Sequence, residues 1–401
     1  MTLLASAAVT DRMDVLGTAL QVSESCIVIE LEEGSVHTFD AHGQPLKLFT
    51  SQDDEAFSKR FKGFSLVGDK LLVAKETIGQ LELIDTVTGK TTTSMKLSEQ
   101  PKKIIPYHDG QFDFIIASAS LANVQLISLS SKLEIPAPKM ITATADIPSY
   151  KIFKHHIAQS TLALLCARGI VQLWHIPSLM QSDKKLRNMC TICFTESFPP
   201  LSSDTGIRQR SEERAAAEIF CVLVHSTNRI LTGHGDGKIK LWDISIVSEE
   251  MSFRKEGYHP RFLSKPVCIV QNSTPGYLVN GFLEYHQAGS TTPNVVSTDT
   301  DGFVKLWRFH DHNSSNNFQL SLVGQHKLFD HAVLCRAITT EGWLVAGGKE
   351  GGSQEDVCGL DAQVKALKLV NLDNESTTEV KELGDPSLAV WDLKIVNHEG
   401  S

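Results

Sequence analysis

The sequence predicts an all-β protein built from repeated small antiparallel sheets. Three observations indicate this fold class. Short runs of alternating apolar and polar residues are spread along the chain, as in strands with one buried face. Turn residues of the Asp-Gly type separate pairs of these runs, as in hairpins. The pairs recur at a nearly constant spacing in the first half of the chain, which is typical of a repeat architecture.

The clearest copies are residues 229–244, RILTGHGDGKIKLWDI, and 294–309, NVVSTDTDGFVKLWRF. Each consists of an apolar strand, an Asp-Gly turn and an alternating strand that reaches Leu-Trp. Residues 161–176, TLALLCARGIVQLWHI, repeat this pattern with Arg168-Gly169 at the turn. Because glycine accepts the positive φ of a tight turn, we expect all three segments to be antiparallel hairpins.

Weaker copies bring the number of units to seven. The turn residues fall at positions 34, 79, 122, 169, 237, 302 and 362, so the spacings are 45, 43 and 47, then 68, 65 and 60. The first three match a four-stranded repeat of about 40–45 residues. The longer spacings predict inserted loops at about 181–216, 276–292 and 349–361. The second of these reads either as a hairpin before unit six or as part of an extra, degenerate unit.

The composition is that of a globular protein, with 401 residues, 41% hydrophobic and 21% charged. Lys and Arg number 38 against 47 Asp and Glu, and the net charge of −9 disfavours nucleic-acid binding through a broadly basic surface. No apolar run approaches the about 20 residues of a membrane-spanning helix. Eight cysteines in a chain of this length do not indicate a disulfide scaffold. No secretory signal is recognised, so we expect a cytoplasmic or nuclear protein.

Trp242-Asp243 after GHGDGKIKL, and Trp307 after DTDGFVKL, resemble blades of the WD-repeat β-propeller family. The resemblance implies one domain over residues 1–401, a seven-bladed propeller of four-stranded antiparallel blades that stack radially. It further implies a ring closed by the C-terminal strand, with residues 388–396 pairing near 26–39. Residues 377–383, TTEVKEL, are then an outer strand of unit seven.

The family resemblance also implies a buried network that links a strand Ser or Thr, the turn Asp and the Trp to an upstream His. The residues that fit this pattern are Thr232, Asp236 and Trp242 in unit five, and Ser297, Asp301, Trp307 and His259 in unit six. We expect these residues, and Trp174 in unit four, to be structural.

Motifs for catalysis are absent from the sequence. It contains no G-x-S-x-G elbow, no phosphate-binding P-loop and no G-x-G-x-x-G. Cys190 and Cys193 have CxxC spacing, but zinc needs four ligands and no second CxxC exists. The pairs His155-His156 and His310-Asp-His312 are interpreted as solvated residues near strand ends or loops. We therefore predict no enzyme activity, no cofactor and no metal.

The predicted function is a non-catalytic protein–protein interaction platform, a subunit or adaptor of a larger intracellular complex. We expect the chain to be a monomer within that complex, with protein partners and no membrane contact. The predicted contact residues lie on loops at blade edges and in the first insertion: Arg168, His234, Asp299, Phe198 and Arg210. One alternative is an accessory subunit that helps an enzyme bind RNA or DNA through the basic segment 184–214. The other is a propeller hydrolase with a site at the channel mouth.

Overall fold

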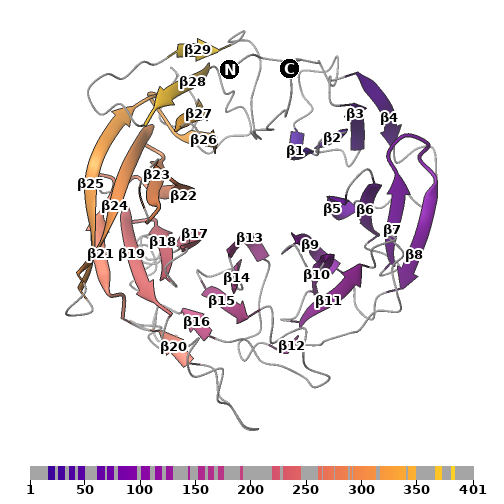
Figure 1. Cartoon of the computed structure of the whole chain (residues 1–401), viewed down its shortest axis with the longest axis horizontal. Helices are drawn as coiled ribbons and strands as arrows, with labels where there is room; N and C mark the ends of the chain where they lie inside the picture. Colours follow the sequence, from indigo (N-terminus) through magenta and orange to yellow (C-terminus); the bar gives the residue numbers. More distant parts are fainter. Residues whose placement is uncertain are drawn as a thin grey trace, which may run out of the picture. The chain divides into compact units, whose positions relative to one another are not determined.

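A computed structural model of the chain shows strands as its regular elements (Figure 1). The structure describes residues 17–22, 26–31, 36–40, 44–49, 61–67, 70–75, 80–96, 101–108, 113–119, 123–129, 143–144, 152–158, 161–166, 170–175, 190–192, 219–225, 229–244, 261–263, 265–274, 276–287, 290, 292–312, 317–339, 342–348, 366–372 and 381–383. The described residues up to Thr144 belong to one compact unit, and those from Ile152 to Leu383 belong to a second.

The first unit contains three four-stranded sheets, each antiparallel and in chain order. Sheet I consists of β1 (Gly17–Val22), β2 (Cys26–Leu31), β3 (Val36–Asp40) and β4 (Pro45–Phe49). Sheet II consists of β5 (Phe61–Val67), β6 (Lys70–Lys75), β7 (Gln80–Asp85) and β8 (Thr91–Lys96). Sheet III consists of β9 (Pro101–His108), β10 (Asp113–Ala119), β11 (Asn123–Leu129) and β12 (Ala143–Thr144).

The second unit contains four sheets of the same kind. Sheet IV consists of β13 (Ile152–Ala158), β14 (Thr161–Cys166), β15 (Ile170–His175) and β16 (Cys190–Ile192), with β20 (Arg261–Leu263) as a fifth strand. Sheet V consists of β17 (Ile219–His225), β18 (Arg229–His234), β19 (Lys238–Asp243) and β21 (Cys268–Gln271). Sheet VI consists of β22 (Val279–Tyr285), β23 (Asn294–Asp299), β24 (Phe303–His312) and β25 (Asn317–Lys327). Sheet VII consists of β26 (Val333–Ile338), β27 (Trp343–Gly348), β28 (Ala366–Asn371) and β29 (Lys381–Leu383).

The all-β repeat predicted from the sequence is confirmed in its pattern. Each of the seven predicted turn positions falls between the second and third strands of one sheet. The outer strand expected at 377–383 is present as β29, which pairs with β28. Alternation along each strand therefore located the central hairpin of every sheet, including the weak copies.

The core of the second unit lies between neighbouring sheets, because the middle strands of a sheet bury both faces. In sheet V, Ile230 and Trp242 pack toward sheet IV, whereas Leu231 and Leu241 pack toward sheet VI. All four side chains are at most 1% exposed. Burying one such aliphatic side chain contributes about 1.5–3 kcal/mol. Sheet V is therefore stabilised by apolar contacts on both of its faces.

Both readings of residues 276–292 are wrong, and the loop predicted at 181–216 contains one strand. Residues 276–292 contain β22, the first strand of sheet VI itself, so they are neither a separate hairpin nor an extra unit. Residues 181–216 contain β16, which supplies the fourth strand of sheet IV. The loop predicted at 349–361 and the closing strand at 388–396 lie outside the described residues.

Among the described residues, no helix has the length and apolar character needed to cross a bilayer.

Candidate interaction face

The strand register places a hydroxyl against each of two buried tryptophans. Trp242 lies opposite Ile230 and Trp307 lies opposite Val295. Thr232 and Ser297 lie two residues after Ile230 and Val295 on β18 and β23. Thr232 Oγ1 accepts the indole N–H of Trp242, and Ser297 Oγ accepts that of Trp307, both at 2.8 Å. The predicted link between the tryptophan and the strand Ser or Thr is confirmed in sheets V and VI.

In sheet VI the network continues into the loop that precedes β22. The Ser297 hydroxyl donates to Asn272 Oδ1 at 2.5 Å. Asp299 Oδ2 accepts from Ser273 Oγ at 2.7 Å and from Asn272 Nδ2 at 3.3 Å. All four side chains belong to residues that are at most 4% exposed. Buried side-chain hydrogen bonds therefore hold the loop before the first strand to the second strand.

The same carboxylate also shapes the turn between β23 and β24. Asp299 Oδ1 accepts the backbone N–H groups of Asp301 at 3.1 Å and Phe303 at 2.9 Å. Burial raises the pKa of Asp299, while the hydrogen bonds from Ser273 and from these backbone groups lower it. With four donors to its two oxygens, Asp299 has the partners that a buried carboxylate needs.

The acid predicted for this network is wrong in both sheets. The predicted acids, Asp236 and Asp301, lie one residue before the turn glycine. In sheet VI the acid of the network is instead Asp299, three residues before that glycine. In sheet V the equivalent residue is His234, whose Nε2 lies 2.9 Å from Thr232 Oγ1. The upstream partner in sheet VI is Asn272, and His259 lies outside the described residues.

His234 and Asp299 were expected on exposed loops, as partner-binding residues. The structure places neither of them on a loop. Each ends a strand, paired with Ile219 or Val279, and each is 0% exposed. The hairpin turns begin one residue later than the sequence suggested, so these side chains point into the core. The other predicted contact residues, Arg168, Phe198 and Arg210, lie outside the described residues.

The turns and the loops before the next sheet form one continuous edge, which we call the turn rim. It comprises residues 235–238, 271–274, 276–278, 300–303 and 327–332, which include the strand ends beside the turns. Gly237 and Gly302 adopt positive φ values of 77° and 83°. Gly237 O accepts the N–H groups of Asn272 and Ser273 at 2.9 and 3.0 Å, and Gly302 O accepts that of Leu328 at 3.0 Å. A Cβ at Gly302 would lie 2.0 Å from Phe329 O, so no side chain fits there.

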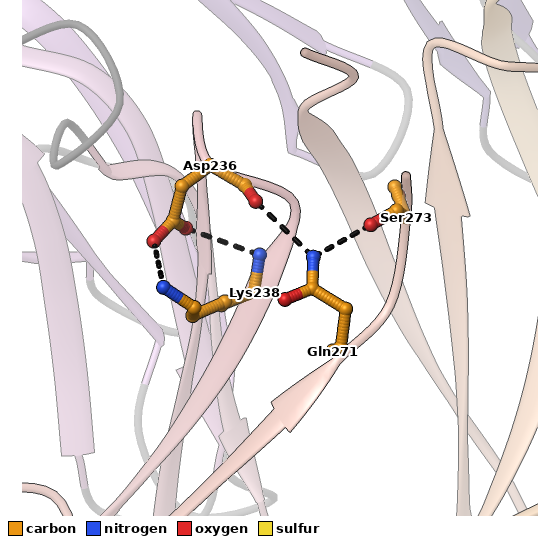
Figure 2. Close-up of polar contacts among 4 residues, drawn as sticks. All are labelled: Asp236, Lys238, Gln271 and Ser273. Carbon is orange, nitrogen blue, oxygen red and sulfur yellow. Dashed lines mark hydrogen bonds and ion pairs between the residues drawn. The ribbon is translucent and has the colours of Figure 1, made fainter. Parts of the chain in front are cut away.

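Side chains reinforce this edge at the sheet V turn (Figure 2). Asp236 accepts from the backbone N–H of Lys238 at 3.1 Å and pairs with its Nζ at 2.7 Å. Gln271 Nε2 bridges the carbonyl oxygens of Asp236 and Ser273, at 3.2 and 2.6 Å (Figure 2). The last strand of the sheet, the turn and the following loop are thus joined.

The sheet VI turn carries a second acid–lysine pair. Asp301 Oδ1 lies 3.3 Å from Lys327 Nζ, and the Lys327 side chain is 47% exposed. The ammonium groups of Lys327 and Lys305 each lie 5.2 Å from the centre of the Phe303 ring. Such distances favour cation–π attraction. Lys305 also donates to Asn272 O. The sheet VI turn therefore places one acid–lysine pair and a second lysine at a half-buried aromatic ring.

The histidine pairs lie in strands rather than in loops. His155 and His156 belong to β13, and His156 Nδ1 accepts the backbone N–H of Val224 at 3.1 Å. Burial lowers the pKa of His156 to about 4, so this ring is neutral at pH 7. His310 and His312 belong to β24, and His310 Nε2 lies 2.6 Å from Ser321 Oγ. The interpretation as solvated residues is wrong for His156, whereas His310 is half-buried and lies near the end of β24.

No group of three or more metal-ligating side chains occurs in the described part of the chain. Cys190 lies in β16, and Cys193 lies outside the described residues. Sequence reasoning missed Gln271, Asn272 and Ser273, because they lie before the first strand of sheet VI and outside the hairpin that repeats.

No protein-family model matches the sequence, and no curated protein matches it. Among solved structures, the chain is similar to the computationally designed Ika8 protein, with 12% identity and a TM-score of 0.58 over 96% of this chain and 92% of that one. It is also matched to the β-propeller domain of Cps50 (Swd1) from Myceliophteria thermophila, with 9% identity and a TM-score of 0.45 over 93% and 90% of the two chains. At 12% identity, the likeness to Ika8 is one of fold.

Proposed function

We propose that the chain is a seven-bladed β-propeller of the WD-repeat kind and serves as a non-catalytic platform for protein partners. In this proposal the seven sheets are the blades, and a C-terminal strand closes the ring. The protein is a monomeric subunit or adaptor of a larger complex in the cytoplasm or nucleus. Its partners bind the turn rim of sheets V and VI.

The observation that carries the proposal is the buried network beneath the rim. Asp299, Asn272 and Ser273 fix the loop and the turn to each other, so the rim's backbone is ordered before any partner arrives. An ordered surface binds without losing the conformational entropy that a flexible loop would lose. A network of this kind supports binding rather than catalysis, because its polar groups are occupied by one another.

The charges of the rim favour a protein partner over nucleic acid. Lys238 and Lys327 are each paired with an aspartate, so neither contributes an uncompensated positive charge. Binding to a phosphate backbone relies on unpaired Lys and Arg that release counterions. Two acid–lysine pairs, one of them beside the Phe303 ring, instead match the polar groups and aromatic contacts common in protein interfaces.

Affinity purification of the tagged full chain from its native cells, followed by quantitative mass spectrometry, tests this proposal. The chain is compared with a double variant, Lys238→Glu with Lys327→Glu, and with the control Lys90→Glu on the β7–β8 turn. Lys90 is exposed and belongs to the other unit rather than to the residues of the rim, so it supplies a matched charge reversal.

We expect the full chain and the control to retain a stoichiometric set of partner proteins, and the double variant to lose at least one of them. Recovery of the full chain alone would contradict the platform function. Retention of every partner by the double variant would contradict the placement of the binding face.

A further inference from the structure

The segment between the third and fourth strands of sheet V contributes a strand to the neighbouring sheet IV. After β19, the chain forms β20, which pairs with β16 of sheet IV (Figure 1). It then returns as β21, which pairs with β19. β16 and β20 run parallel, with Cys190, Thr191 and Ile192 opposite Arg261, Phe262 and Leu263. Every other strand pair of the described residues is antiparallel.

Sheet IV is thereby set apart from the other six. In those sheets the fourth strand is the last, and in sheet IV a fifth strand covers it. Without β20, the outer row of backbone N–H and C=O groups of Cys190–Ile192 would be open, and an open strand edge is a template for another strand. β20 thus covers an edge that could receive another extended segment.

The contact that covers this edge is short and separable from the rest of the fold. Its ladder spans three residues, and parallel pairing is slightly less stable per residue than antiparallel pairing. Sheet V does not need β20, because β21 pairs directly with β19, and Val267 N donates to Leu241 O at 2.8 Å just before β21. β20 can therefore leave β16 while sheet V keeps its four strands.

We infer that the outer edge of β16 is a strand-addition site, that β20 closes it in the free chain, and that an extended peptide segment of a partner protein opens it by displacing β20. The incoming segment runs parallel to β16, and its backbone replaces the ladder that β20 makes. Main-chain hydrogen bonds give affinity in such complexes, and alternate side chains give specificity. The sequence Arg-Phe-Leu of β20 indicates the segment that fits, with a basic, an aromatic and an aliphatic residue in succession.

Because β20 belongs to the same chain as β16, it competes strongly with any free peptide for the edge of β16. A tethered segment acts at an effective concentration in the millimolar range, so a free peptide of the same sequence competes poorly with it. A partner must therefore bind more tightly than Arg-Phe-Leu alone, or contact a second surface. This site lies at the edge of sheet IV rather than on the turn rim, so its test does not depend on the rim.

The test uses a fluorescent peptide of residues 259–265, HPRFLSK, and the full-length protein in three forms. These are the unaltered chain, the variant Phe262→Pro and the control Lys265→Pro. Proline lacks the N–H that a ladder needs and disrupts β20 at its centre, whereas Lys265 lies outside both β20 and β21. A peptide with proline in place of its phenylalanine controls for binding elsewhere.

Fluorescence anisotropy is expected to show at least about tenfold tighter peptide binding to Phe262→Pro than to the unaltered chain or to Lys265→Pro. The proline peptide is expected to bind none of them. Hydrogen exchange of the Cys190–Ile192 amides should accelerate in Phe262→Pro and slow again when the peptide is added. Equal peptide binding to all three forms would overturn the inference. So would the absence of binding to a Phe262→Pro variant whose near-ultraviolet circular dichroism matches that of the unaltered chain.

Discussion

Replacing Asp299 by alanine tests the role assigned to the buried network. The change removes the acceptor of two buried side-chain donors, Ser273 Oγ and Asn272 Nδ2, and of two backbone N–H groups at the turn. A buried donor left without a partner costs about 1–3 kcal/mol. Asn272 Nδ2 keeps its 2.8 Å hydrogen bond to Ser273 Oγ. The backbone groups lie at the turn and can reach water, so Ser273 Oγ sets a loss of about 1–3 kcal/mol in the free energy of unfolding.

A matched control is two residues away. Asp301→Ala removes a carboxylate from the same turn, but its Oδ1 pairs with the exposed Lys327. Exposed ion pairs contribute at most about 1 kcal/mol. Urea unfolding followed by tryptophan fluorescence should therefore show a much lower midpoint for Asp299→Ala than for Asp301→Ala. Equal shifts in the two variants would refute the assignment of Asp299 as the acid of the network.

Three further predictions follow from buried groups. Trp174 Nε1 has no hydrogen-bond partner among the described residues, and Leu164 occupies the position in sheet IV that Thr232 occupies in sheet V. A threonine there would supply the acceptor, so thermal unfolding should find Leu164→Thr more stable than Leu164→Val by about 1 kcal/mol. The reverse order would contradict a hydrogen bond from Trp174 to the new hydroxyl. Burial lowers the pKa of His225 to about 4, below the ordinary 6.5. As the pH falls below 6.5, the His225 side chain is protonated in the unfolded chain before it is protonated in the folded one, so the free energy of unfolding should fall by up to about 3 kcal/mol between pH 6.5 and pH 4. Urea titrations should show a smaller loss for His225→Gln. An unchanged loss would exclude His225 as its source. Gly302→Ala, at positive φ and with Phe329 O in the way, should cost at least about 2 kcal/mol, and a neutral effect in the same assay would contradict the tight turn.

The sequence was most informative about the central hairpins. Alternation and turn residues located the second and third strands of all seven sheets. The pattern is informative because shifting a strand's register by one residue would move its apolar side chains to the opposite face of the sheet. The pairing of Trp242 and Trp307 with their hydroxyl partners came from the family resemblance rather than from the alternation, and the hydrogen bonds confirm it.

The sequence was less informative where partners come from outside the hairpin. Asn272 and Ser273 precede the first strand of sheet VI, and nothing in the hairpin pattern points to them. His234 and Asp299 resembled loop residues because polar side chains before Asp-Gly are usually exposed, yet strand pairing carries both into the core. β20 escaped prediction for a related reason, since no local pattern shows that a strand will pair with a neighbouring sheet.

Hydrogen exchange tests the central claim that the turn rim is an ordered binding face. It is measured by mass spectrometry on the isolated full chain and on the complex purified from native cells. In the isolated chain, the amides of Asn272, Ser273 and Leu328 should exchange as slowly as strand amides, because Gly237 and Gly302 accept their hydrogen bonds. In the complex, protection should increase further over the rim. Exchange at the rate of an unstructured loop in the isolated chain, or new protection confined to other surfaces in the complex, would contradict the account.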